Sequence, residues 1–255
     1  MAFAHETWLL GTRTLRRFAR VPANPASTIL FPVIQLVVFS QLFRGIIALP
    51  GFGDQKSYLD YLLPGQIAFT AFFAVAWSGG NLLADYRSGY LDKLRAAPIR
   101  RYAILAGELM PLALEVAMMS AVILIIGVLL GANVATGLPG AIAIILLAAG
   151  FGVAWSGVSF VPALVTKNEQ ATSTLSLLLF PIAFMSTAFV PVALMPDWLQ
   201  AVNVLNPISY IIEAMRAFMI GTVSAGVVVS AVLAIVILGV ILQGATMWAF
   251  RRLTE

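Results

Sequence analysis

The sequence predicts an all-α integral membrane protein with six transmembrane helices, and two observations carry that prediction. The first is composition: of the 255 residues, 61% are hydrophobic and 10% are charged, with a mean hydropathy of +0.97. Charged residues make up about a quarter of ordinary soluble sequences, so this chain has too little polar surface to cover a soluble globule. The second is a series of long apolar segments, each with the ~20 residues that a helix needs to cross a bilayer.

The apolar segments define the elements in order. We expect transmembrane helices at about 26–48, 58–83, 103–131, 138–165, 171–195 and 223–249. Several prolines lie inside these spans and indicate kinks, which membrane helices tolerate when neighbouring helices satisfy the freed backbone groups. We find no convincing internal repeat and no second domain, so residues 1–255 are expected to form a single transmembrane domain.

The distribution of Lys and Arg predicts the orientation. With the N-terminus in the cytoplasm, six spans leave only Arg44, Lys56 and Arg216 of the 15 basic residues outside. Because cytoplasmic loops are enriched in Lys and Arg, this bias predicts that both termini are cytoplasmic. A seventh span at 197–219 would weaken the bias and place Asp197, Glu213 and Arg216 in the bilayer, at ~2.5–3.5 kcal/mol for each charge at mid-helix.

The N-terminal residues 1–22 suit a cytoplasmic helix that lies in the membrane interface. Arg13, Arg16, Arg17 and Arg20 follow helical spacing on one face, with apolar residues largely on the other. Such a basic amphipathic helix binds beside anionic lipid. The alternative is a plain basic flank of the first span.

The segment DYRSGYLDKLRAAPIRR, residues 85–101, is a highly charged cytoplasmic connection between the second and third spans. Tyr86, Tyr90, Leu91 and Leu94 recur at helical spacing among the charges, and Pro98 ends that helix. A loop that only set the membrane topology would need fewer basic residues and no exposed Tyr and Leu side chains. A docking helix for a cytoplasmic partner explains both the basic residues and these apolar side chains.

The extracellular stretch 191–222 is too polar to span and too apolar to be a free loop. Pro196 and Asn206–Pro207 divide it into two short helices, near 197–205 and 208–219. An interfacial anchor, with Trp198 in the aromatic belt, is the simpler alternative to a functional role.

These features together resemble the ABC-2 type permeases, the membrane subunits of type V ABC exporters, with the daunorubicin-resistance branch nearest. The resemblance extends over nearly the whole chain. It rests on three groups of residues: the charged segment with Asp85, Gly89, Leu91, Leu94, Pro98, Arg101 and Gly107; Leu63–Pro64–Gly65; and the tail Pro196, Trp198, Leu199, Asn206, Pro207, Glu213, Arg216 and Gly221.

The resemblance implies a half-transporter that works as a homodimer or heterodimer of permeases, with two nucleotide-binding subunits. Those ATPase subunits would dock on 84–101 and on the turn 166–170, through Asp85, Arg87, Gly89, Leu91, Leu94, Pro98, Arg100, Arg101, Lys167 and Glu169. It also implies that the two extracellular helices are re-entrant and gate the exit, through Trp198, Asn206, Pro207, Glu213 and Arg216.

Ionisable and polar residues inside the spans are candidates for the translocation path. Glu115 lies near the middle of the third span, where a charge is costly and by default functional. Its alternative role is structural, as a protonated or hydrogen-bonded group that joins helices. The other path candidates are Gln35 on the first span and Ser173 and Ser176 on the fifth, for which helix–helix contact is the simpler role.

Composition excludes several classes of chemistry. With no Cys and one His (His5), disulfides, thiolate metal sites and multi-His metal sites are excluded. The chain has no G-x-x-x-x-G-K-[ST] phosphate loop, so ATP and Mg²⁺ would bind a separate subunit, and this chain needs no cofactor.

The leading hypothesis is therefore an ABC exporter permease of a bacterial inner membrane, in contact with lipids and not with nucleic acid. It would export an amphipathic, lipid-like or drug-like substrate. The alternative is a proton-coupled secondary transporter that uses Glu115, although such carriers usually contain inverted repeats.

Overall fold

The structure, a computed structural model, describes residues 23–49, 52, 57–89 and 101–252, and these residues form helices and no strands. The N-terminal helix expected at 1–22 and residues 90–100 of the predicted docking helix lie outside the described residues. In chain order the elements are α2 (Ala23–Leu42), the 3₁₀ helix η1 (Arg44–Ala48), α3 (Tyr58–Arg87), α5 (Arg101–Leu129), α6 (Gly137–Trp155), α7 (Gly157–Thr166), α8 (Glu169–Leu178), α9 (Phe180–Phe184), the 3₁₀ helix η2 (Val192–Leu194), α10 (Asp197–Leu205), α11 (Pro207–Ile220) and α12 (Ala225–Arg252).

Four of the helical segments are long and apolar enough to cross a membrane: Tyr58–Arg87, Ala103–Leu129, Gly137–Thr166 and Ala225–Arg252. They coincide with the second, third, fourth and sixth predicted spans. The all-helical fold with long apolar helices is that of an integral membrane protein.

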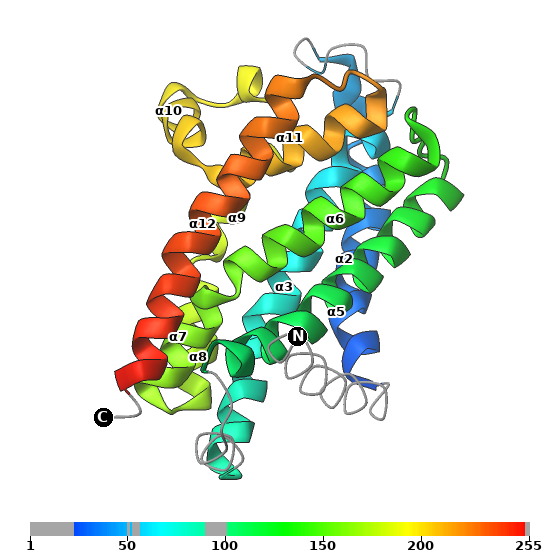
Figure 1. Cartoon of the computed structure of the whole chain (residues 1–255). Helices are drawn as coiled ribbons and strands as arrows, with labels where there is room; N and C mark the ends of the chain where they lie inside the picture. The colour runs from blue at the N-terminus through cyan, green and yellow to red at the C-terminus, as the bar shows by residue number, and fades with distance from the viewer. Residues whose placement is uncertain (1–22, 50–51, 53–56, 90–100, 253–255) are drawn as a thin grey trace.

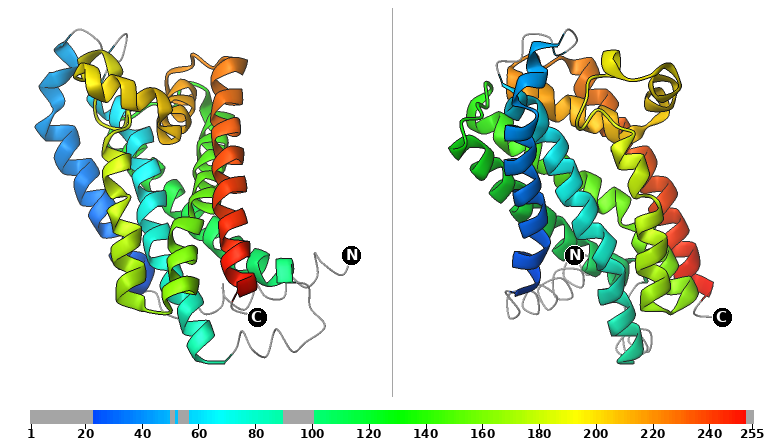
Figure 2. Two further views of the ribbon diagram at one scale, coloured as in Figure 1. Left: turned by 90° about the vertical axis from the view of Figure 1, so that its left-hand side faces the viewer. Right: turned by 180° about the vertical axis from the view of Figure 1, so that it is seen from behind.

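Helix α3 is the centre of the bundle. It packs against α2, α5, α6, α7, α8 and α11, and it supplies several fully buried side chains of the main apolar core, including Leu62, Ile67, Phe69 and Phe72. Helices α2 and α8 flank it on one side of the bundle (Figure 2). Helix α12 lies at the periphery, with few of its side chains buried.

The first predicted span is shorter than expected. Helix α2 ends at Leu42, and the chain continues as η1, so the prediction of one helix over 26–48 was wrong at its end. Arg44 and Gly45 follow after Phe43. A charged residue and the residue with the weakest helix propensity after Pro explain why the α-helix stops there.

The fifth predicted span is broken, and the prediction of one helix over 171–195 was wrong. Helix α8 ends at Leu178, α9 covers only Phe180–Phe184, and no α-helix forms again before Asp197. Pro181 explains the break, because its ring has no N–H to donate and clashes with the preceding turn.

The fourth span is interrupted once, at Ser156, where α6 ends and α7 begins. A Ser–Gly pair is a common cause of a break in a helix, and Gly157 follows Ser156 directly.

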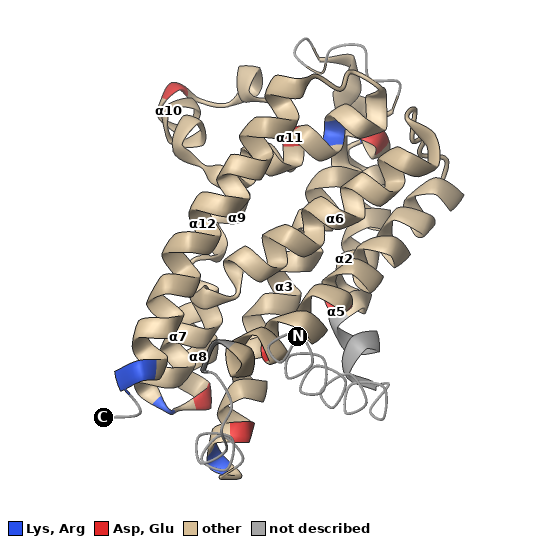
Figure 3. Ribbon diagram, in the orientation of Figure 1, with Lys and Arg blue, Asp and Glu red and all other residues tan. Residues whose placement is uncertain are grey.

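Charged side chains lie mostly at two ends of the bundle (Figure 3). We call one the basic end, defined by Arg87, Lys167, Arg251 and Arg252. The other is the capped end, which α10 and α11 cover (Figure 1). Helix α2 begins and α12 ends at the basic end, so the described chain starts and finishes on the same side.

Candidate functional site

At the capped end, an irregular segment replaces the outer half of the predicted fifth span. We call residues 185–191 the strap. Because the strap is not helical, its carbonyl groups lack the backbone hydrogen bonds that a helix would supply. An unpaired carbonyl in an apolar setting costs several kcal/mol. Side chains from elsewhere take up the strap's carbonyl groups: Tyr61 Oη donates to Thr187 O at 3.0 Å, and Tyr58 Oη to Phe189 O at 3.1 Å.

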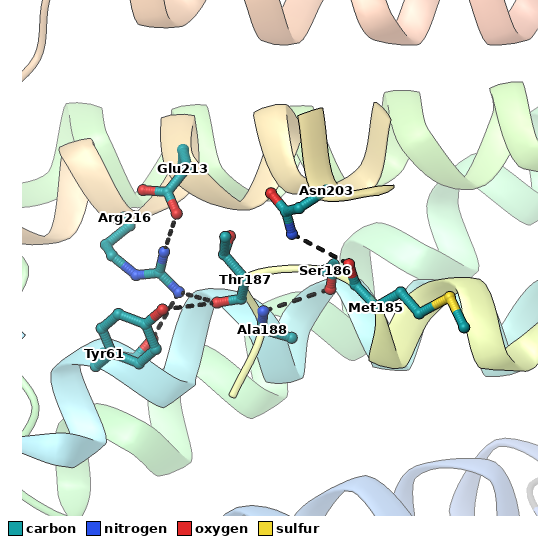
Figure 4. Close-up of polar contacts among 8 residues, drawn as sticks. All are labelled: Tyr61, Met185, Ser186, Thr187, Ala188, Asn203, Glu213 and Arg216. Carbon is teal, nitrogen blue, oxygen red and sulfur yellow. Dashed lines mark hydrogen bonds and ion pairs between the residues drawn. The ribbon is translucent and has the colours of Figure 1, made fainter. Parts of the chain in front are cut away.

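Arg216 of α11 holds the centre of the strap (Figure 4). Its Nη2 donates to the carbonyl of Thr187 at 2.7 Å and to that of Tyr61 at 3.3 Å, and its Nη1 pairs with Glu213. The guanidinium carbon lies 3.7 Å from the centroid of the Tyr61 ring. The side chain is 5% exposed, so this cation is buried among protein groups that compensate its charge.

Two asparagines join α10 and α11 to the end of α9. Asn203 Nδ2 donates to Met185 O at 3.1 Å, and Asn206 Nδ2 to Ile182 O at 2.8 Å. Asn206 also begins α11, because its Oδ1 accepts from Ile208 N at 3.0 Å while Pro207 occupies the first helical position. The same residue therefore ends one helix, starts the next and anchors both.

Two of the predicted gate residues, Glu213 and Arg216, contact each other beside the strap (Figure 4). Asn206 lies at the predicted division between the two helices, where it bonds to Ile182 O and Pro207 follows it as the first residue of α11. Trp198 does not join these contacts, because it lies on α10 with 61% of its surface exposed. The contributions of Tyr58, Tyr61, Thr187 and Asn203 were not predicted from the sequence.

Close packing also fixes the strap against α3. A Cβ on Gly65 would lie 2.5 Å from the carbonyl oxygen of Ala188, so only glycine fits at this position. Gly65 belongs to the Leu63–Pro64–Gly65 stretch that contributed to the family resemblance, and the close approach supplies its physical reason.

At the basic end, the end of α3 meets the turn between α7 and α8. Arg87 Nη1 lies 3.7 Å from Glu169 Oε2, and both side chains are more than half exposed. Lys167 Nζ lies 5.2 Å from the centroid of the Tyr86 ring. Lys167 has a positive φ of 52°, which is uncommon for a residue other than glycine and turns the chain sharply before Asn168 caps α8.

The remaining predicted docking residues divide into two groups. Asp85 is buried beneath this surface, and Gly89 ends the helical segment with a φ of +68°. Leu91, Leu94, Pro98 and Arg100 lie outside the described residues. Arg101 begins α5, but its side chain lies outside them too.

The four path candidates are not joined to one another by any hydrogen bond in the described chain. Gln35 Oε1 accepts from Gln66 Nε2 of α3 at 3.2 Å, and both side chains are buried. Ser176 donates back to Thr172 O of its own helix at 2.8 Å. Glu115 is half-buried and makes no hydrogen bond or ion pair with any residue that the structure describes.

Phenylalanine side chains on either side of Gln35 belong to a continuous series of ring contacts. Phe31 and Phe39 lie one turn either side of Gln35 on α2. The contacts run Phe31–Phe73 at 5.3 Å, Phe73–Phe180 at 5.1 Å, Phe180–Phe184 at 4.9 Å, Phe184–Phe189 at 5.5 Å and Phe189–Phe39 at 5.7 Å between centroids. The series returns to α2 through Phe189 of the strap, which contacts Phe39 one turn from Gln35.

Comparison with known proteins identifies the family. The profile of the ABC-2 type transporter family matches residues 5–220. The chain belongs to the ABC-2 type transporter family. This confirms the resemblance seen in the charged segment and the tail.

Three relatives show where in the family the similarity lies. The daunorubicin resistance ABC transporter permease protein DrrB1 of Streptomyces coeruleorubidus is 30% identical over 82% of this chain and 73% of its own length. The probable doxorubicin resistance permease DrrC of Mycobacterium tuberculosis is 27% identical over 86% of this chain and 78% of its own. The putative transport permease ycf38 of Cyanophora paradoxa is 28% identical over 84% and 74%. The chain is therefore an ABC-2 permease, a multi-pass membrane protein related to drug-resistance transport subunits.

Proposed function

We propose that this chain is the permease subunit of an ATP-driven exporter that moves an amphipathic, lipid-like or drug-like substrate out across the cytoplasmic membrane. ATP and Mg²⁺ would bind a separate ATPase subunit, and two permeases would form the path. The observation that carries the proposal is the joined surface at the basic end, where Arg87 of α3 pairs with Glu169 across the α7–α8 turn. The basic end would face the cytoplasm, as the excess of Lys and Arg there favours.

The basic-end surface suits a protein partner. Its ion pair is exposed, so it contributes little to the fold, about 0–1 kcal/mol, and can exchange partners at small cost. Beside the pair, Lys167 lies over the ring of Tyr86, so this surface presents charged and aromatic groups together, as protein-binding surfaces commonly do.

Helix α3 connects this surface to the capped end. Its 30 residues form one helix of about 45 Å, with Arg87 in the last turn and Tyr58 and Tyr61 in the first. Because both tyrosines donate to the strap, any movement of α3 that reaches its first turn would act on the contacts around Arg216. This continuity supports coupling between ATP hydrolysis and an exit gate made of α10 and α11.

The Gln35–Gln66 pair and its phenylalanines are the part of the path that we assign to substrate contact. Gln66 Oε1 is buried with no partner, so it can accept a hydrogen bond from a substrate. Phe31 and Phe184 are about half exposed and offer ring faces to a planar or apolar group. Polar and aromatic groups side by side suit a substrate that is itself amphipathic.

The experiment that tests the docking surface is a charge exchange. The chain would be co-expressed with its ABC ATPase subunit and reconstituted in vesicles. Arg87→Glu and Glu169→Arg alone should lower ATPase binding and transport, and the double variant should recover part of both, whereas Arg44→Glu at the capped end should leave ATPase binding unchanged. Normal binding and normal transport in both single variants would refute a docking role for this surface.

The substrate path is tested separately by Gln66→Leu, which keeps side-chain volume but removes the free acceptor. Transport of amphipathic dyes should change in rate or in substrate range, while the ATPase remains bound. An unchanged transport rate for every dye would remove the glutamine pair from the path.

A further inference from the structure

A five-residue sequence occurs twice in this chain and marks one level of the bundle. Val-Ala-Trp-Ser-Gly is found at 75–79 inside α3 and at 153–157 across the α6–α7 junction. In both copies the serine hydroxyl donates to the carbonyl of the residue three positions earlier: Ser78 Oγ to Val75 O at 2.8 Å, and Ser156 Oγ to Val153 O at 2.9 Å.

Hydrogen bonds between helices join the two copies and α12 at this level. Ser159 Oγ accepts from Gly79 N at 2.9 Å and donates to Ala76 O at 3.3 Å, which links α7 to α3. Gln243 Nε2 of α12 donates to Val153 O at 2.7 Å and to Ser156 Oγ at 2.9 Å. We call Ser78, Gly79, Ser156, Ser159, Gln243 and Thr246 the polar layer.

The polar layer separates two apolar cores. The larger core lies on the side of the capped end and includes Val75 of α3 and Val158 of α7. A second, smaller core lies on the side of the basic end and consists of Leu82, Ile104, Leu105, Phe160, Leu164, Ala249 and Phe250. Its members come from α3, α5, α7 and α12, so four helices form a separate packed unit at the basic end.

All four helices contain a residue that weakens the helix near this level. Helix α3 has Gly79–Gly80, the fourth span is interrupted before Gly157, and α12 has Gly244 next to Gln243. Helix α5 has Pro111 between its contacts to the two cores. Gly–Ser pairs and prolines are the usual sites at which helices bend.

The hydrogen bonding of the polar layer leaves room for a second arrangement. Gln243 Oε1 is buried and has no partner, so the layer contains one unused acceptor. The hydrogen bonds of the polar layer involve hydroxyl and carbonyl oxygens, which can change partners after a small displacement of one helix against another. The closely packed apolar cores resist such a displacement.

From these observations we propose that the polar layer is a hinge, and that the small core at the basic end moves about it as one body when the ATPase acts. The body includes α7 and the adjoining ends of α3, α5 and α12, and it carries Arg87 and Lys167. The inference rests on the proposed function, since the ATPase supplies the motion. Gln243 holds the bent form of the fourth span through its bonds to Val153 and Ser156.

The first test measures the motion. The chain contains no Cys, so spin labels can be placed at will. Exposed Leu146 and Val165 lie on opposite sides of the interruption, about 28 Å apart along a straight helix. In the reconstituted complex, their distance distribution should shift when ATP is trapped on the ATPase. A control pair at exposed Leu138 and Val232, both on the side of the capped end, should not shift.

The second test stiffens the hinge without a clash. A Cβ at Gly80 meets its nearest atom at 3.8 Å, and a Cβ at Gly244 meets nothing within 4 Å. Each Gly→Ala change should disfavour bending about fourfold, as expected from helix propensity. Gly80→Ala with Gly244→Ala should reduce the nucleotide-dependent shift and the transport rate. Gly150→Ala, a helix-interior glycine beyond the polar layer with only an ordinary contact at 3.6 Å, should change neither.

The outcomes separate the hinge from the proposed function. Transport with an unchanged Leu146–Val165 distance in the wild type, or unimpaired transport in the stiffened double variant, would overturn the hinge and leave the exporter intact. Failure of the wild-type chain to bind the ATPase or to transport would overturn the proposed function itself.

Discussion

The buried guanidinium of Arg216 should control how firmly the strap is closed, and Arg216→Met removes it with little loss of volume. The change deletes the pairing with Glu213, the 2.7 Å bond to Thr187 O and the contact with the Tyr61 ring. Hydrogen bonds to charged groups contribute ~1.5–3 kcal/mol each, but relief of the desolvation of the cation offsets part of the loss. We expect the closed strap to lose about 3 kcal/mol, which corresponds to about 100-fold more frequent opening.

Thiol labelling measures that opening. Thr187 is 1% exposed and its hydroxyl has no partner, so Thr187→Cys keeps the backbone acceptor and disturbs little. In purified protein, the Cys at 187 should react slowly beside Arg216 and about 100-fold faster in Arg216→Met, from the same free-energy difference. Arg216→Lys should fall between, because an ammonium keeps the charge but cannot reproduce the forked donors.

An exposed position provides the matched control for this labelling. A Cys at Thr222, just beyond α11, should react at the same rate in every Arg216 background. A rate at 187 that changes less than threefold on Arg216→Met, with the Thr222 control unchanged, would refute the reasoning that Arg216 closes the strap.

Three further predictions concern single positions. Asn206→Ala should destabilise the protein by about 1–2 kcal/mol, since it removes a helix cap and the bond to Ile182 O. Asn206→Asp should recover only the cap, and thermal unfolding in detergent distinguishes the two variants. Gly65→Ala should prevent assembly of the capped end, seen as fast labelling at Thr187→Cys, because its Cβ overlaps the backbone of the strap. If Glu115 serves the path, Glu115→Gln should preserve folding but lower transport; if it only joins helices, Gln should be silent and Glu115→Leu should weaken dimer formation. Wild-type transport and dimer content with Leu at 115 would exclude both roles.

Local sequence signals predicted the helices of the capped end well. Pro196 and the Asn206–Pro207 pair mark helix ends through their own backbone chemistry, and α10 and α11 begin where those residues place them. The four long apolar helices were predicted for the same reason, because length and hydropathy are local properties. The side of the membrane on which each end lies stays a prediction.

The strap and the hinge depend on contacts that no local signal carries. The partners of Thr187 O are Tyr61, 126 residues earlier, and Arg216, 29 residues later. The predicted position of Arg216 outside the membrane stays a prediction, but its burial in protein, where Glu213 and carbonyl groups compensate its charge, was not predicted. The repeat at 75–79 and 153–157 is only five residues long, and nothing in the local sequence indicates that the two copies lie at one level of the bundle.

The strap also bears on the order in which this protein is made. Helices α8 and α9 together cover little more than half the length expected of the fifth span, and α8 contains Thr172, Ser173, Thr174 and Ser176. As this part of the chain leaves the ribosome, Tyr58 and Tyr61 of α3 are already available to the strap's carbonyl groups. The later partners Asn203 and Arg216 are not yet synthesised, and neither is Asn206, which bonds to Ile182 O of α9. We therefore expect the fifth span to enter the bilayer late, as a hairpin with α10 and α11, after the first four spans are in place. A ribosome-bound chain truncated before Asn203 would then leave α8 accessible to water, and one extended beyond Gly221 would not.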